Sequence, residues 1–204
     1  MTNSRKDGYH TYSGAHFDRI RKMREGQAVY NELQKQAAIK ANRNLMEEFK
    51  ELQSKKTRQT LPFGTKYIYR GVKNINNASN YQRNSQGNYL KDYKSYISFS
   101  RSIEVAKGFA SGGFANSPAI LILDIREISK KVPLIYDGMW GFKSANPEEK
   151  EVLLPPGRLV ISRHPLRTVQ HGNNRIPILR VVNFFPNKAV RNMSTGKINP
   201  YKKK

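Results

Sequence analysis

Three short segments in the middle of the chain carry polar residues suited to the chemistry of a nucleotide. Arg70 ends an alternating run and precedes Gly71. A guanidinium offers a planar set of donors that matches phosphate oxygens, and glycine lets a ligand approach the backbone closely. Ser98 and Ser100 flank Phe99, so the alternation of a strand would place both hydroxyls on one face. Hydroxyls in that position can bind and orient a neighbouring carboxylate.

The third segment is a pair of glutamates, Glu149 and Glu151, which leads directly into Val-Leu-Leu-Pro-Pro. We expect both carboxylates on one face of a strand, and one of them to be harder to ionise because like charges repel. This arrangement suits bond cleavage at a sugar, where positive charge develops on the anomeric carbon. One carboxylate can stabilise the cation while the other takes a proton from the attacking group.

Taken singly, each segment also fits an ordinary structural role: a turn at Arg70, a half-buried strand at the serines, an acidic loop at the glutamates. Their fixed order and their places at strand ends favour the chemical interpretation. No G-x-G-x-x-G follows a predicted strand, so a Rossmann dinucleotide fold is not expected.

The elements that must position these residues are helices first and then many short strands. Apolar residues recur at helical spacing between about residues 15 and 54, and again from Ile103, where Ser102 can cap the helix. Asn74–Asn88 is a polar loop. Strands are predicted over residues 66–70, 96–99, 119–125, 151–154, 159–162 and 176–185. Helices followed by strands indicate an α+β fold with a mixed, mostly antiparallel, sandwich-like core.

Composition fits one domain with polar ends. The chain has 204 residues, of which 37% are hydrophobic. We expect a disordered lead over 1–14, a helical segment over 15–60, the core over 61–185 and a basic tail over 186–204. No apolar run approaches the roughly 20 residues of a membrane span, and no apolar stretch follows the basic N-terminus. These features, and the absence of cysteine, predict a cytoplasmic protein or one delivered into a host cell, possibly within a virion.

The formal net charge is +22, and no acidic residue follows Glu151, whereas 11 lysines and arginines do. Such a surface predicts contact with nucleic acid or another polyanion through the C-terminal region. No zinc-finger, zipper or RNP-type motif is present, which argues against sequence-specific reading. The four histidines show no metal-ligand spacing, so no metal is expected.

In this order and spacing, the three segments resemble the mono-ADP-ribosyltransferases of the arginine–serine–glutamate class, which includes vertebrate arginine-specific transferases, bacterial toxins and phage enzymes. The resemblance covers about Tyr67–Ser162 and identifies 61–185 as the catalytic core. Residues 98–100 resemble the family's serine–threonine–serine strand, with Phe99 in place of the usual threonine, and residues 149–151 resemble its glutamate-x-glutamate strand.

The resemblance implies a role for each residue of the motifs. Arg70 would hold the phosphates of NAD, and the Gly71 backbone would contact the nicotinamide amide. Ser98 would hold Glu151 in place, with Ser100 beside it in the NAD site. Glu151 would bind the 2′-hydroxyl of the nicotinamide ribose and stabilise the oxocarbenium-like transition state.

Further residues are implied in recognising the two substrates. Glu149 would orient and deprotonate the acceptor, and in this family a glutamate at that position accompanies arginine acceptors. Phe114, on the Gly112-Gly-Phe loop, would lie near the nicotinamide and phosphates, and Trp140 would lie on an acceptor-recognition loop.

The sequence therefore predicts an enzyme that transfers ADP-ribose from NAD to a protein side chain, with arginine the preferred acceptor and no metal or membrane involved. Two alternatives stay open. One is a basic nucleic-acid-associated protein of virion or chromatin with a catalytically idle fold. The other is an ADP-ribosyltransferase that modifies DNA, against which Glu149, rather than glutamine, weighs modestly.

Overall fold

The computed structural model describes residues 36, 40, 43–45, 47–48, 64–94, 96–113, 115–128, 132–136 and 146–186. Within the expected helical segment 15–60, the described residues before 64 are helical, and Leu45 is fully buried in the main core. Leu45 therefore packs against the strands. The expected lead over 1–14 and the tail beyond Pro186 lie outside the described residues.

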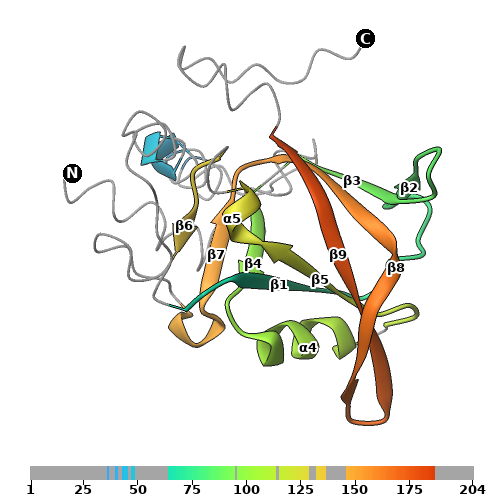
Figure 1. Cartoon of the computed structure of the whole chain (residues 1–204). Helices are drawn as coiled ribbons and strands as arrows, with labels where there is room; N and C mark the ends of the chain where they lie inside the picture. Colours follow the sequence, from blue (N-terminus) through green and yellow to red (C-terminus); the bar gives the residue numbers. More distant parts are fainter. Residues whose placement is uncertain are drawn as a thin grey trace.

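A single nine-stranded sheet dominates the described part of the chain, in the order β2-β3-β8-β9-β5-β1-β4-β7-β6 (Figure 1). The strands are β1 (Tyr67–Val72), β2 (Gln82–Arg83), β3 (Tyr89–Tyr93), β4 (Ile97–Ser100), β5 (Ala119–Asp124), β6 (Ile135–Tyr136), β7 (Glu151–Leu154), β8 (Gly157–His171) and β9 (Asn174–Pro186). Among these strands only β5 and β9 pair in parallel. The α+β class and the mixed, mostly antiparallel sheet predicted from the sequence are confirmed.

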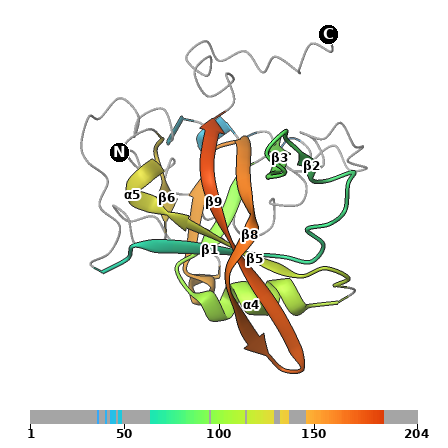
Figure 2. The same cartoon turned by 45° about the vertical axis from the view of Figure 1, so that its right-hand side comes forward.

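The sheet consists of two parts joined at one point. β1 pairs with β5 along its whole length, from Tyr67–Asp124 to Val72–Ala119. Against β4 it makes a single partner pair, Tyr69 with Ser100. β4 then pairs with β7 over four residues. Accordingly β1 and β5 run steeply across β4 and β7 in both views (Figures 1 and 2).

Helix α4 (Ile103–Ser111) follows β4 directly and packs against β1 at Gly71. A Cβ atom on Gly71 would lie 2.6 Å from the Ala110 backbone nitrogen and closer still to the Ala106 carbonyl oxygen. Only glycine therefore allows the helix to approach the strand this closely. Ser102 is the N-cap residue, as predicted, but its side chain makes no capping hydrogen bond.

The main core joins both parts of the sheet, because β1, β4, β5, β7, β8 and β9 all contribute to it. A smaller core lies under α4 and contains Ala106 and Ala110 together with Ile120, Ile176 and Ile178. The alternation of apolar residues along β5 explains the division: Leu121 and Leu123 face the main core, and Ile120 and Ile122 face the smaller one. Among the described residues, no helix is both long and apolar enough to span a membrane.

Several strand bounds differ from the sequence prediction. β8 is 15 residues long, much longer than the predicted 159–162, and β9 has 13 residues and extends slightly beyond the predicted 176–185. Polar residues continue both strands of the hairpin beyond the apolar part on which the prediction relied. β2, β3, β6 and the short helix α5 (Ile125–Ile128) were not predicted, and β2 interrupts the expected polar loop over Asn74–Asn88. A 3₁₀ turn, η3 (Pro147–Glu149), precedes β7.

Candidate active site

The single β1–β4 pair creates a fork in the sheet, which we define as the place where Arg70–Val72 and Ile97–Ser98 part. Continued pairing would place Gly71 opposite Ser98, but the ladder holds only Tyr69 and Ser100. Arg70 reaches across this fork, where its Nη1 donates a hydrogen bond to the Ser98 carbonyl oxygen at 2.5 Å. The fork therefore brings the first two of the three predicted segments into direct contact.

The third segment joins at the same point. Ser100 lies opposite both Tyr69 of β1 and Glu151 of β7. Partners in a ladder point to the same face, so the side chains of Tyr69, Ser100 and Glu151 form one row across three strands. Ser98 shares that face by alternation but lies opposite Leu153. Arg70, between Tyr69 and Gly71, starts from the opposite face and enters the fork along the edge of β4.

The Ser100 hydroxyl supports the glutamate segment. Its Oγ donates to the Glu149 carbonyl oxygen at 2.6 Å and accepts from the Ser102 backbone nitrogen at 2.9 Å. The Arg101 backbone nitrogen donates to the Lys150 carbonyl oxygen at 3.0 Å. The start of α4 and the peptides on either side of Lys150 are thus fastened together.

The prediction that Glu149 and Glu151 lie on one face of a strand is wrong. Glu149 ends the 3₁₀ turn η3, and Lys150 has a φ of 48°, in the left-handed region. Glu151 is the first residue of β7 and is buried, at 6% exposure. A left-handed residue between them breaks the alternation on which the prediction relied, so the two carboxyls have different supports.

Burial raises the pKa of Glu149, and the charge of Glu148 raises it further. The sequence prediction that one carboxyl of this segment is harder to ionise holds in direction, but the cause differs. Desolvation is the larger effect, and the neighbouring charge is that of Glu148.

Two tyrosines that the sequence analysis missed lie beside Arg70. The Arg70 guanidinium carbon lies 5.4 Å from the centre of the Tyr93 ring. Burial raises the pKa of the Tyr81 hydroxyl, and so does its hydrogen bond to Tyr93. The contact between Arg70 and Tyr93 holds the guanidinium through the electron-rich face of the ring. The alternating Tyr-Leu-Lys-Asp-Tyr run of β3 is the sequence signal that indicates a strand at Tyr93, whereas Tyr81 precedes β2 and has no such signal.

The remaining predicted site residues divide into two groups. Gly71 lies at the fork, with its α-carbon against α4. Phe114 and Trp140 lie outside the described residues. Among the described residues, no group of three or more histidines, aspartates and glutamates could hold a metal ion.

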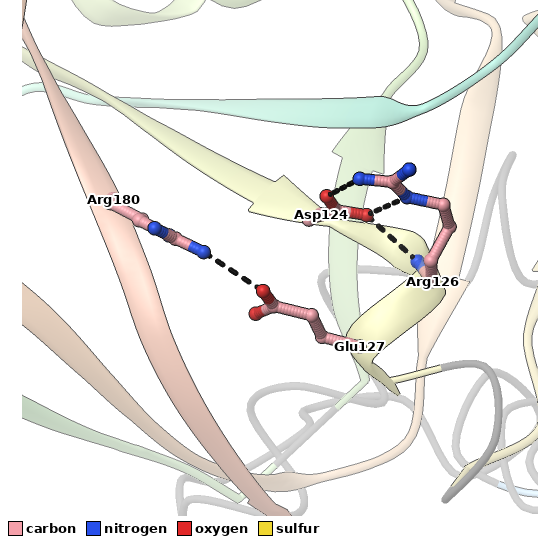
Figure 3. Close-up of polar contacts among 4 residues, drawn as sticks. All are labelled: Asp124, Arg126, Glu127 and Arg180. Atoms are coloured by element: carbon pink, nitrogen blue, oxygen red, sulfur yellow. Dashed lines mark hydrogen bonds and ion pairs between the residues drawn. The ribbon is translucent and has the colours of Figure 1, made fainter.

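A hollow of about 530 Å³ does not lie at the fork; residues of β1, β5, α5, β8 and β9 line it. Its lining includes Tyr67 and Tyr69 and a set of paired charges (Figure 3). Arg126 binds Asp124 through its backbone and side chain, at 2.6 to 3.0 Å, which lowers the pKa of that carboxyl. Arg180 donates to Glu127 at 2.8 Å. These pairs fasten β5, α5 and β9 to one another.

No family model matches the chain, and no curated protein matches its sequence. Solved structures do. Vis toxin, an ADP-ribosyltransferase from Vibrio splendidus, is similar with a TM-score of 0.47 and 17% identity, over 94% of this chain and 77% of that one. The eukaryotic mono-ADP-ribosyltransferase ART2.2 is similar with a TM-score of 0.49 and 16% identity, over 92% and 68%.

The enzymatic component C2-I of the C2 toxin from Clostridium botulinum is similar with a TM-score of 0.49 and 14% identity, over 89% of this chain and 44% of that one. Vis and ART2.2 are ADP-ribosyltransferases, the class that the sequence resembles. With identities of 14–17% and TM-scores of 0.47–0.49 in these three, the likeness assigns neither an activity nor a substrate to this chain.

Proposed function

We propose that the chain is an NAD-dependent mono-ADP-ribosyltransferase that moves ADP-ribose to an arginine side chain of a protein. The observation that carries the proposal is the fork. It gathers an arginine, two serines and a glutamate from β1, β4 and β7, three strands that are adjacent in the sheet but far apart in the sequence.

In the proposed reaction, the bond between the nicotinamide nitrogen and the anomeric carbon of the ribose breaks, and its electron pair leaves with neutral nicotinamide. Arg70 holds the phosphates and Glu151 binds the ribose 2′-hydroxyl. A buried carboxylate close to the developing cation stabilises it more strongly than one in water would. Ser98 and Ser100 border this position on β4.

The second bond forms between the anomeric carbon and a guanidinium nitrogen of the acceptor. A charged guanidinium is a poor nucleophile, so a base must take its proton as the bond forms. Glu149 has this role in the proposal. Its raised pKa suits a proton acceptor, because a more basic carboxylate takes a proton more readily. Phe114 and Trp140 contribute to nicotinamide and acceptor recognition in this proposal.

The experiment is incubation of the purified protein with NAD labelled in the adenylate part and a cell extract, followed by mass spectrometry of the modified residues. We expect ADP-ribose on arginine. Glu151→Gln should abolish labelling, whereas Glu104→Gln, the same change at a carboxylate that is 69% exposed on α4, should not. Labelling that survives Glu151→Gln contradicts the proposed chemistry, and labelling of another residue type contradicts the proposed acceptor.

A further inference from the structure

The β8–β9 hairpin is a long two-stranded ribbon that extends beyond α4 at one end of the molecule (Figures 1 and 2). From Arg167–Ile178 to His171–Asn174 its strands pair in register. Ile176 and Ile178 are buried against the smaller core, so one face of the ribbon is fixed to the body. Its far half is a firmly held projection rather than a loose loop.

The ribbon closes in a tight turn at its tip. Gly172 has a φ of 56°, as the first central residue of a type II′ hairpin turn requires. The Gln170 side-chain nitrogen donates to the Gly172 carbonyl oxygen at 2.6 Å. Asn173, Asn174 and Arg175 continue the tip and are exposed. The tip therefore presents hydrogen-bond donors and no apolar side chain.

The charged residues of the ribbon are all basic, and they differ in whether they form ion pairs. The ribbon contains five arginines and no acidic residue. Arg158 and Arg180 form ion pairs with acids from elsewhere, Asp92 and Glu127. The other three, Arg163, Arg167 and Arg175, are exposed, and none forms an ion pair with an acid in the described part of the chain. Arg163 lies at the irregular part of β8, Arg167 borders the hollow described above, and Arg175 lies beside the tip. We call these three the ribbon arginines.

We propose that the ribbon arginines bind the phosphate backbone of duplex DNA. A two-stranded antiparallel ribbon has the width that the major groove of B-form DNA admits, about 12 Å. Guanidinium groups bind phosphates, and the amides of the tip can donate to phosphate or base edges. The major groove of A-form RNA is too deep and narrow for such an element, so duplex DNA is the better fit.

The test uses the full chain, with the basic C-terminal residues intact, and a fluorescent 20-base-pair DNA duplex. Binding is followed by anisotropy over a salt series. For B-form DNA, log K falls with log salt with a slope of about 0.9 for each phosphate neutralised. Replacing all three ribbon arginines by glutamine should therefore reduce the slope by about 3, and weaken Kd by up to about 500-fold at 0.1 M salt.

The matched control replaces Lys40, Arg43 and Lys94 by glutamine, which removes the same charge from exposed positions on other elements. It should change the slope by less than about 1. Equal slopes for the two triple variants would overturn the proposal, since net charge alone would then account for binding. The assignment to DNA would be overturned if duplex RNA or polyglutamate bound as tightly as DNA and depended on the ribbon arginines in the same way. Circular dichroism of both variants shows whether the fold is intact.

Discussion

Replacing Gly71 with alanine tests the contact on which the candidate site is built. The added methyl carbon would lie 2.6 Å from the Ala110 nitrogen and 2.9 Å from the Phe109 Cβ, and the Ala106 carbonyl oxygen is closer than either. Two of these three atoms belong to the helix backbone, so a change of side-chain rotamer cannot relieve the clash. Helix α4 must move by roughly 1 Å, and overpacking of this kind costs about 1–3 kcal/mol or more.

The φ of Gly71 is not positive, so an alanine there meets no backbone strain and the loss of stability comes from the clash. For a chain of this length, 1 kcal/mol corresponds to about 2–4 °C in Tm. We therefore expect Gly71→Ala to lower Tm by roughly 2–12 °C. The assay is thermal unfolding followed by circular dichroism, with NAD turnover measured at a temperature where both proteins are folded.

Gly108→Ala is the matched control, because Gly108 lies within α4 and a Cβ there has no atom within 4 Å. Alanine in a helix interior stabilises by about 0.5–1 kcal/mol relative to glycine. The two substitutions should thus shift Tm in opposite directions. If Gly71→Ala unfolds at the wild-type Tm yet no longer uses NAD, the packing argument is refuted and close approach of the ligand is the reason for glycine.

Three further outcomes follow from the site. Ser100→Ala removes the donor to the Glu149 carbonyl oxygen, so urea unfolding should show a loss of about 1–3 kcal/mol, and equal stability would contradict this support. Because burial raises the pKa of Glu149, the folded state holds this proton more tightly than the unfolded state does. The resulting stability is present below the ordinary value of 4.5 and is lost as pH rises through the folded value. Glu149→Gln should therefore raise Tm more at pH 7 than at pH 4, and the reverse order would contradict the shift. Tyr93→Leu removes a cation–π contact with Arg70 worth about 0.5–2 kcal/mol, so KM for NAD should rise about 2- to 30-fold with kcat nearly unchanged. Tyr93→Phe keeps the ring and should keep the wild-type KM, although it loses the hydrogen bond with Tyr81 and should be less stable.

The sequence predicted those elements whose pattern is local. β7 has the predicted bounds, Glu151–Leu154, because its apolar run is bounded by a charged residue and by proline. β5 begins as predicted, after Pro118, and ends one residue earlier than predicted, at Asp124. The pairing of these strands depends on contacts between distant segments, and no local pattern specifies that β1 and β4 share a single pair. The fork is therefore a tertiary feature that the sequence alone did not reveal.

Two details of the site also lay outside the reach of sequence patterns. Left-handed backbone usually falls on glycine or asparagine, and a lysine at position 150 gives no sign of it. The position of Tyr93 beside Arg70 required β3 to pair with β8, a strand more than 60 residues later. By contrast, the arginine, serine and glutamate segments that meet at the fork were identified from the sequence, through their order and their places at strand ends.

The different supports of the two glutamates are consistent with different tasks. Glu151 is buried at the start of a strand, with its position fixed by the ladder to Ser100. Glu149 is half-buried in a short turn and is held through its backbone carbonyl, so that in the proposed reaction its carboxyl can meet the second substrate. A carboxylate that must stabilise a cation benefits from rigid placement, because preorganised charge needs no rearrangement during the reaction. A base for an incoming protein needs access instead. Ser100 connects the two, since its strand position faces Glu151 while its hydroxyl holds the peptide of Glu149, so its loss should impair transfer to an acceptor more than hydrolysis of NAD.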